Sequence, residues 1–255
     1  MILRRLGNKQ AIAAEIQKHF PEHRFYVEPF FGAGGMFFNK PKVEYNLLND
    51  LDDNVFNLFQ VLLNSKQDFK DLIYKMPINS TLLKYWKKNE ETEPIKKALR
   101  FIFLSNYTYL GKGDTVKFGL GENSQKLVYD KIDVTYDLFY GTLFTNFDFR
   151  KLFKSFQIRA DVSKDKVLIY CDPPYLGTND NYSNSFSEQD SIDLFDCLQA
   201  TGCKFAMSEF DNEFILNQAK ERCLNVIVIG ERKNLKNRRT EILITNYEKQ
   251  KSLFD

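Results

Sequence analysis

The chain has 255 residues, and its 36 Lys and Arg against 34 Asp and Glu give a formal charge of only +2. This balance excludes a protein that adheres to polyanions over its whole surface, so any nucleic-acid surface must be a local patch. Hydrophobic residues make up 43% and charged residues 27%, which excludes a disordered or collagen-like chain. We expect one large domain, with or without an insertion.

Three sequence features bear on location and metal chemistry. No apolar run is long enough to cross a bilayer, and the first residues lack the apolar stretch of a signal peptide, so we expect a cytoplasmic protein without membrane contact. The four cysteines form no C-x-x-C pair, which predicts four buried thiols and no metal site. His19 and His23 lie in a polar stretch and are expected at the surface.

The N-terminal quarter of the chain alternates helical and strand patterns. Ile12, Ile16 and Phe20 form one helical stripe that ends at Pro21. The expected elements are a helix over 9–19, a strand over 24–27, a glycine turn over 28–35, a short helix over 36–38, a strand over 44–48 and a helix over 52–65.

The C-terminal half resumes this alternation. Strands are expected over 141–146, 166–170, 204–207, 225–229 and 240–245, and helices over 186–200 and 211–223. Such alternation predicts an α/β sheet flanked by helices. Residues 66–140 break the rhythm with helical pieces and a glycine-rich loop, so we interpret them as an insertion that selects the substrate, within a catalytic domain formed by residues 1–65 and 141–255.

The glycine turn is the first candidate site. Gly32 and Gly34 stand where a chain leaving a strand turns into a helix and a ligand can approach the backbone. A dinucleotide site would have a third glycine where Phe37 stands, which weakens a nicotinamide interpretation. Asp50 closes the next strand and could accept both ribose hydroxyl protons of a nucleoside. A purely structural turn and a helix N-cap at Asp50 are the alternatives.

Asp172-Pro173-Pro174-Tyr175 is the more specific motif. At average residue usage of about 5% each, it arises by chance in roughly one chain in a thousand. It follows an apolar strand, at the end where open α/β sheets bind ligands. The Asp172 carboxylate and the proline carbonyls are acceptors, while Tyr175 offers a flat face. The alternative is a proline turn with Tyr175 in the core.

This set of acceptors suits a planar exocyclic amine such as N6 of adenine. The lone pair of that nitrogen is delocalised into the ring, and two acceptors on its N–H groups localise it for attack on an electrophile. Cytosine N4 and glutamine N5 present a similar amine, so acceptor geometry leaves these substrates open.

Together the motifs resemble the Dam-like DNA adenine-N6 methyltransferases with the D12-type arrangement. The resemblance rests on Glu28-Pro29-Phe30-x-Gly32-x-Gly34 followed, after an insertion, by Asp172-Pro173-Pro174-Tyr175. It extends to Leu6-Gly7-Asn8-Lys9, Leu48-Asn49-Asp50, the segment 146–149 and the segment 239–247. It implies a Rossmann-like, S-adenosylmethionine-dependent methyltransferase sheet of seven strands with an antiparallel hairpin at one edge, and an inserted, mainly helical target-recognition region.

The resemblance also implies roles for residues. S-adenosyl-L-methionine would be the cofactor, with its ribose on Asp50, its adenine near Asp148 and Phe149, and its methionine half held by Arg5, Leu6, Gly7, Lys9, Glu28, Pro29, Phe30, Gly32 and Gly34. Asp172 would also border the cofactor. The catalytic set would be Asp172, whose carboxylate holds the target amine, Pro173, whose carbonyl takes the second proton, and Tyr175, which stacks on the base.

Two segments are candidates for contact with double-stranded DNA. The loop from residue 106 to 119 lies where the family places its base-reading finger, and there we expect Asn106, Tyr107 and Lys112 to contact DNA. The segment 232–239 has five positive residues in eight and no acid, as at a hairpin tip that grips phosphates. Its candidates are Arg232, Lys233, Lys236, Arg238 and Arg239.

The target adenine must be flipped out of the duplex to be reached. A cognate restriction endonuclease is a possible partner, with DNA marking as the other purpose; the oligomeric state is not predicted. The alternatives are RNA as the polymer, a cytosine-N4 methyltransferase, a non-catalytic DNA-binding relative and a nicotinamide-dependent oxidoreductase.

Overall fold

The computed structural model describes residues 1–5, 7–117, 123–158, 161–176, 186–233 and 238–248. The chain forms two compact units. The first, here called the helical unit, comprises Met1–Ala11, Gly32–Asn39 and Asp50–Thr142. The second, the sheet unit, comprises Ile12–Phe31, Lys40–Asn49 and Leu143–Asp255.

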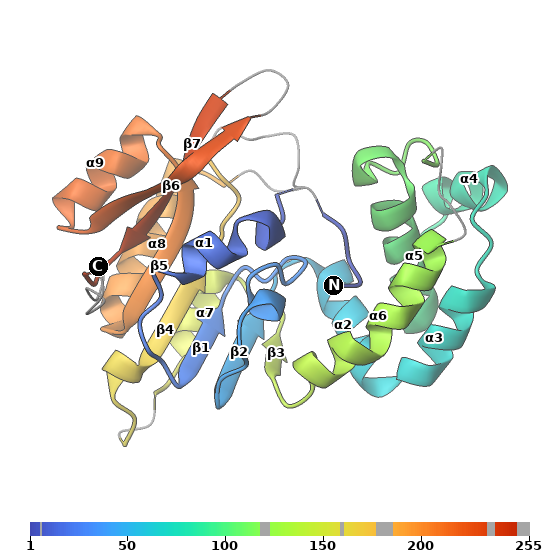
Figure 1. Cartoon of the computed structure of the whole chain (residues 1–255), viewed down its shortest axis with the longest axis horizontal. Coiled ribbons are helices and arrows are strands. Elements are labelled where there is room, and N and C mark those ends of the chain that lie inside the picture. The colour runs from blue at the N-terminus through green and yellow to red at the C-terminus, as the bar shows by residue number, and fades with distance from the viewer. Residues whose placement is uncertain (6, 118–122, 159–160, 177–185, 234–237, 249–255) are drawn as a thin grey trace. The chain divides into compact units, whose positions relative to one another are not determined.

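The sheet unit is built on one seven-stranded sheet in the order β3-β2-β1-β4-β5-β7-β6 (Figure 1). Strands β1 to β5 run parallel to one another, whereas β7 is antiparallel to both β5 and β6. The strands are β1 (Phe25–Glu28), β2 (Tyr45–Asn49), β3 (Leu143–Thr145), β4 (Val167–Cys171), β5 (Lys204–Phe210), β6 (Asn225–Lys233) and β7 (Arg238–Thr245). This is the sheet that the resemblance implies, including the antiparallel pair at one edge.

Strand β4 lies between β1 and β5, and its five residues, Val-Leu-Ile-Tyr-Cys, are all buried. A continuous apolar run is what a parallel strand covered on both faces requires. The helices of this unit are α1 (Ala13–Gln17), α7 (Phe149–Ser155), α8 (Glu188–Thr201) and α9 (Glu213–Glu221). Ile169 of β4, Phe205 of β5 and Phe195 of α8 share one core cluster without solvent exposure, so the strand that leads to the proline motif is rigidly packed.

The helical unit contains α2 (Asp53–Asn64), α3 (Lys66–Lys75), α4 (Ser80–Lys88), α5 (Pro94–Tyr107) and α6 (Asn123–Phe139). Three of its helices begin at side-chain caps: Asp52 caps α2, Asn79 caps α4, and Glu93 caps α5 just before Pro94. Phe59 of α2 and Phe139 of α6 stack with ring centroids 4.8 Å apart, which joins the helix before the predicted insertion to the last helix of the insertion. The whole stretch 66–140 lies in this unit, which also contains α2 and residues 32–39.

Several expectations about local structure were wrong. The helix predicted over 9–19 is a 3₁₀ turn (Lys9–Ala11) followed by α1, which ends at Gln17, and the helix predicted at 36–38 is a 3₁₀ turn (Phe37–Asn39). Cys223 is exposed in the turn that follows α9, and Cys197 is partly exposed on α8. Both histidines are only partly exposed, and burial lowers the pKa of His23.

Among the described helices, none combines the length and the apolar character that crossing a membrane would require. Within the described ranges, no group of three or more His, Cys, Asp or Glu side chains is arranged to hold a metal ion.

Candidate active site and cofactor site

The proline motif leaves the carboxyl end of β4. Asp172 follows Cys171 directly and is partly exposed, Pro173 is buried, and Pro174 and Tyr175 are partly exposed. The Tyr175 hydroxyl donates a hydrogen bond to Glu241 Oε1 over 2.6 Å. Burial, followed by the negative charges of Asp172 and Glu241, raises the pKa of Tyr175 well above its ordinary value, so this phenol stays protonated. Two acceptors and an aromatic ring therefore lie in sequence at the end of a central strand.

Asn49 ties together the loops that follow β1 and β3, a role that the sequence did not indicate. Its Nδ2 donates to the carbonyls of Pro29 and Phe147, both at 2.9 Å, and its Oδ1 accepts from the Phe147 amide at 2.9 Å and the Thr145 hydroxyl at 2.8 Å. Asn49 is 1% exposed, so these bonds are shielded from water. Its side chain fixes the path of the Glu28–Phe30 segment beside the segment that carries Asp148.

Glu28 is buried at the end of β1, with 2% of its surface exposed. One of its carboxylate oxygens accepts a hydrogen bond from the Tyr26 hydroxyl over 2.8 Å. Burial and the Glu28 charge raise the pKa of Tyr26 well above its ordinary value. After Pro29, the Phe30 ring contacts the rings of Phe149 and Phe186, with centroids 5.8 and 6.0 Å away. The sheet unit thus forms an aromatic wall next to Asp148.

Asp148 caps helix α7, and its Oδ1 accepts from the Arg150 amide over 2.9 Å. The Arg150 guanidinium reaches three carboxylates: Asp193 at 2.7 Å, Asp148 at 3.4 Å and Asp190 in a short contact. It also lies over the Phe149 ring, 4.3 Å from the centroid. Partial burial alone would lower the pKa of Arg150, but the carboxylates hold it above its ordinary value. Arg150, absent from the predicted site, therefore orients both Asp148 and Phe149.

The glycine turn and Asp50 both belong to the helical unit. Asp50 Oδ2 accepts from the Gly32 amide over 2.5 Å, and Asp50 Oδ1 accepts from the Asp52 amide over 2.8 Å. Burial, only partly offset by these amides and by Arg5, raises the pKa of Asp50 to about 6. The helix α2 is capped by Asp52, so the alternative of Asp50 as the N-cap is wrong.

The two glycines of this turn differ in their surroundings. Gly32 has φ +56°, and a Cβ built on it would meet no atom within 4 Å, which leaves open space beside its backbone. A Cβ on Gly35 would lie 2.0 Å from Asn8 Oδ1 and 3.0 Å from the amides of Lys9 and Gln10. Gly35, which the sequence argument did not single out, therefore allows the N-terminal segment to pack on the turn.

These residues fit a nucleoside donor. The open space beside Gly32 admits a ligand against the backbone, and the buried Asp50 carboxylate provides the anionic acceptor that ribose hydroxyls bind.

The N-terminal segment adds two basic side chains to the helical unit. Arg5 forms an ion pair with Asp52 at 3.0 Å, Lys9 is 3% exposed, and Gly7 is exposed. Leu6, predicted to hold the cofactor, lies outside the described residues.

A pocket of about 560 Å³ lies within the helical unit, lined by Arg4, Arg5, Ser105, Tyr109, Leu110, Gly111 and Lys117. Lys117 Nζ donates to the Asn106 carbonyl over 2.9 Å. Burial and the nearby charge of Arg4 lower the pKa of Lys117. Arg4 and Lys117 were not predicted site residues, although Lys117 lies in the predicted base-reading loop. The pocket is basic, as an anionic ligand would require.

The predicted DNA contacts in this loop have different surroundings. Asn106 Nδ2 donates to the Ile2 carbonyl at 2.7 Å, and its Oδ1 accepts from the Arg4 amide at 2.8 Å. Tyr107 is 1% exposed, and burial raises its pKa to about 12. Lys112 is exposed. Asn106 and Tyr107 thus shape the wall that carries Arg4, while Lys112 faces solvent.

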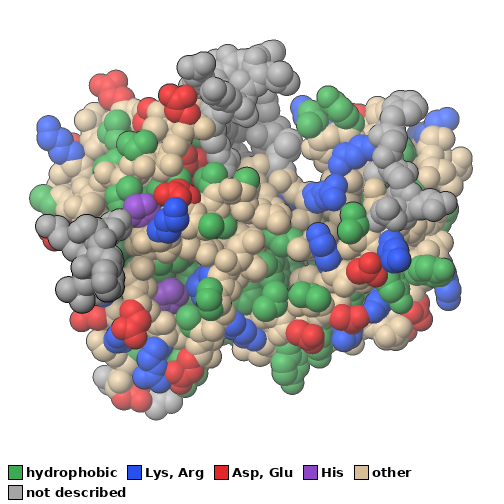
Figure 2. All heavy atoms as spheres, viewed as in Figure 1, with side chains coloured by type: hydrophobic (Ala, Val, Ile, Leu, Met, Phe, Trp, Pro, Cys, Tyr) green, Lys and Arg blue, Asp and Glu red, His purple; other side chains and the backbone are tan. Residues whose placement is uncertain are grey.

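The basic segment 232–239 joins β6 and β7, the antiparallel pair at the edge of the sheet. The register places Arg232 opposite Arg239 and Lys233 opposite Arg238. Lys236 lies outside the described residues. Elsewhere basic and acidic side chains are interspersed on the visible face (Figure 2), in keeping with the small net charge. The register thus places four positive residues at paired positions of the two strands, and these positions are here called the basic cluster of the hairpin.

Comparisons with known proteins identify relatives of this chain. A "DNA adenine methylase" of Vibrio cholerae serotype O1 is 26% identical over 247 residues, which cover 87% of this chain and 85% of that enzyme. One of Haemophilus influenzae is 30% identical over 183 residues, 66% of this chain; the match spans 61% of that enzyme's length. An rRNA methylase structure from Streptococcus thermophilus superposes with a TM-score of 0.43 and 6% identity, over 93% of this chain and 95% of that one.

A family model matches residues 6–235, from the N-terminal segment through the glycine turn and the proline motif into the basic hairpin. The chain therefore belongs to the D12 class N6 adenine-specific DNA methyltransferases.

Proposed function

We propose that this protein methylates N6 of an adenine flipped out of duplex DNA, with Asp172, Pro173 and Tyr175 as its catalytic residues. One observation carries the proposal: the Asp172 carboxylate, the Pro173 carbonyl and the Tyr175 ring follow one another at the end of the buried strand β4. A strand end packed on both sides holds such groups at fixed positions, which the geometry of a transfer reaction requires.

The Asp172 carboxylate and the Pro173 carbonyl accept the two N–H groups of the target amine. Both bonds draw the nitrogen away from planarity, so its lone pair is no longer shared with the ring. S-adenosylmethionine, the methyl donor of this family, would supply an electrophilic methyl group on a sulfonium. As the N6–methyl bond forms, the sulfur–methyl bond breaks to leave the thioether product, and the amine loses one proton. Tyr175 stacks on the flipped base, and stacking of roughly 1–3 kcal/mol offsets part of the energy lost on leaving the duplex.

We propose contacts to the donor for each unit by itself. In the helical unit, Asp50 accepts from the ribose hydroxyls, while Gly32, Gly34 and the Arg5–Lys9 segment, Gly7 included, hold the methionine half. In the sheet unit, Asp148 accepts from the donor's adenine amine and Phe149 contacts its ring, both oriented by Arg150. The segment Glu28, Pro29 and Phe30, fixed in part by Asn49, completes this set.

We assign duplex contact to the basic cluster of the hairpin and to Lys112. Like charges directly across an antiparallel pair destabilise it. The register places Arg232 opposite Arg239 and Lys233 opposite Arg238, which lowers the stability of the hairpin. Bound phosphates would compensate this repulsion. A partnership with a cognate restriction endonuclease would require that methylation by this protein protect one specific DNA sequence from cleavage.

The test is expression in a host without adenine methylation, followed by sequencing of its DNA for modified adenine and a radiolabelled methyl-transfer assay on that DNA. The wild type should modify one short sequence, and Asp172→Ala should lower transfer at least about 100-fold while the protein stays folded. The exposed Asp165 provides a matched control, because Asp165→Ala removes a carboxylate near the other end of β4. Transfer to RNA or cytosine, or full activity of Asp172→Ala, would refute the proposal.

A further inference from the structure

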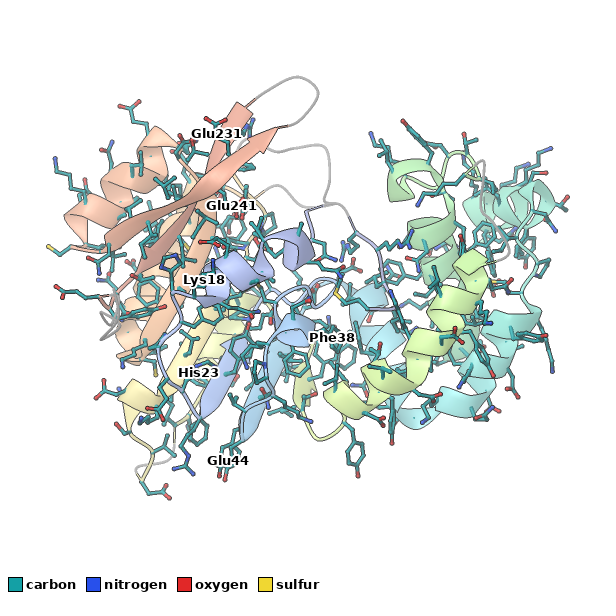
Figure 3. All side chains as sticks on the ribbon, viewed as in Figure 1. Lys18, His23, Phe38, Glu44, Glu231 and Glu241 are labelled. Atoms are coloured by element: carbon teal, nitrogen blue, oxygen red, sulfur yellow. The ribbon has the colours of Figure 1, made fainter. Side chains whose placement is uncertain are left out.

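Strand β7 carries a buried acid among apolar neighbours. Glu241 is 1% exposed, and the next three residues along the strand, Ile242, Leu243 and Ile244, are equally buried. Figure 3 labels Glu241, and Glu231 of the neighbouring strand lies nearer the end of the hairpin. Burial of a carboxylate is costly unless hydrogen bonds compensate it. The bond from Tyr175 is therefore a strong determinant of where both side chains lie.

The bond is short and its donor is unambiguous. The Tyr175 hydroxyl lies 2.6 Å from Glu241 Oε1, and the raised pKa of Tyr175 keeps the proton on the phenol. A hydrogen bond to a charged acceptor in a buried place is stronger than a neutral one. The hydroxyl end of the ring is thus fixed by a residue 66 positions further along the chain.

A second contact fixes the plane of the ring. The rings of Tyr175 and Phe210 meet edge to face, with centroids 4.6 Å apart and planes at 82°. Phe210 pairs directly with Glu241 across the β5–β7 register, so both side chains project from the same face of the sheet. The Arg239 guanidinium lies 5.2 Å from the Phe210 ring centroid. Neighbouring positions of two strands therefore hold both the hydroxyl and the ring of Tyr175.

We propose that Glu241 is a positioning residue that holds the Tyr175 ring in the orientation that receives the flipped adenine. This inference rests on the proposed function. An unrestrained tyrosine would lose rotational freedom on stacking with the base, whereas a ring already fixed by Glu241 and Phe210 loses little. The hydrogen bond thereby favours the extruded base over the base in the duplex.

Four variants separate positioning from a merely structural role. Glu241→Leu removes the acceptor and Tyr175→Phe removes the donor, so each single variant deprives the other group of this hydrogen bond. The double variant with both substitutions contains neither group. Glu241→Gln keeps an acceptor oxygen of similar size. The measurements are thermal unfolding, the single-turnover methyl-transfer rate, and the fluorescence of 2-aminopurine placed at the target position of a duplex.

If Glu241 positions Tyr175, both single variants lose stability, and both lower the transfer rate and the 2-aminopurine signal about three- to tenfold. The double variant regains stability but keeps the low rate and signal, because the ring is still untethered. Glu241→Gln retains more than half of the wild-type rate. The exposed Glu213 serves as control, since Glu213→Leu on α9 should leave rate and signal unchanged.

A double variant that regains rate and signal together with stability would overturn the inference, and so would single variants with wild-type rates. Failure of the proposed function gives a different result, because the wild type itself would then neither transfer methyl groups to adenine nor raise the fluorescence of the probe.

Discussion

The Asp50 carboxylate accepts a hydrogen bond from the Gly32 amide over 2.5 Å, and this bond joins the acid after β2 to the turn after β1 within the helical unit. The acid is held in place before any ligand binds. Because burial raises its pKa to about 6, Asp50 titrates close to neutral pH.

This pKa makes Asp50 a source of pH dependence. Its folded-state pKa is raised, so its ionisation disfavours the folded state as pH rises from about 4 to above 6. Relative to wild type, Asp50→Asn should gain stability over this range, by at most about 3 kcal/mol and less where solvent screens the charge. Donor affinity of the wild type should fall as pH drops below about 6, since a protonated Asp50 no longer accepts both ribose hydroxyls. Denaturant unfolding and donor titration at pH 4.5–8 would check the predicted stability and the predicted donor affinity. A stability difference between Asp50→Asn and the wild type that does not change with pH would contradict the raised pKa of Asp50.

The two glycines of the turn should respond differently to alanine. Gly32→Ala places a side chain at φ +56° in open space, so we expect a stability loss of about 1–2 kcal/mol and a weaker donor affinity from the filled space. Gly35→Ala forces its Cβ against Asn8 and the Lys9 and Gln10 amides, so it should destabilise the protein more. Calorimetric donor binding and thermal unfolding separate the two effects. If Gly32→Ala and the wild type bind the donor with equal affinity, the proposed contact between the donor and this turn is refuted.

Arg150 offers a test of the Asp148 assignment that leaves the carboxylate itself unchanged. Arg150→Ala removes three partly exposed ion pairs, each worth no more than about 1 kcal/mol, so the stability loss should be about 1–2 kcal/mol. Donor affinity should fall because Asp148 and Phe149 lose their common support. Arg150→Lys keeps the charge but not the planar fork, and should recover stability more than affinity. Donor binding equal to wild type in Arg150→Ala would show that Asp148 needs no such support.

The basic hairpin should make DNA binding sensitive to salt. Replacing Lys233 and Arg238 by Gln removes one of the like-charged cross-strand pairs, so stability should not fall. Affinity for any duplex should decrease, and the slope of log affinity against log salt should lessen by about 0.9 for each phosphate that the variant no longer neutralises. A control with Lys164→Gln and Lys220→Gln removes two exposed charges elsewhere on the sheet unit. An unchanged slope in the hairpin variant would rule out phosphate binding there.

The strands were predictable because each carries its own signal. The apolar run of β4 and the hydrophobic β5 and β6 are separated by helical patterns, β7 has its own apolar run, and the proline motif marks the end of β4. The short 3₁₀ turns were not predictable, since packing of residues 8–10 on Gly35 decides their conformation. Local sequence does not specify that packing.

The residues that support the candidate site were not predictable from local sequence either. Asn49, Arg150 and Glu241 each act across separations of about 20 to 98 residues, so only the folded chain reveals their partners. Asp172 and Asp50, by contrast, were found from their positions at strand ends. The family resemblance also could not reveal that Asn106 and Tyr107 are buried, because helix α5 packs its last turn inward.

Strand β7 lies between β5 and β6, although it follows both in the chain. During synthesis on the ribosome, β6 has no neighbour in the sheet until β7 has emerged and inserted. Glu241 arrives with that strand, so Tyr175 gains its hydrogen-bond acceptor only at a late stage of translation. The Tyr175–Glu241 hydrogen bond therefore depends on the last strand of the sheet in chain order.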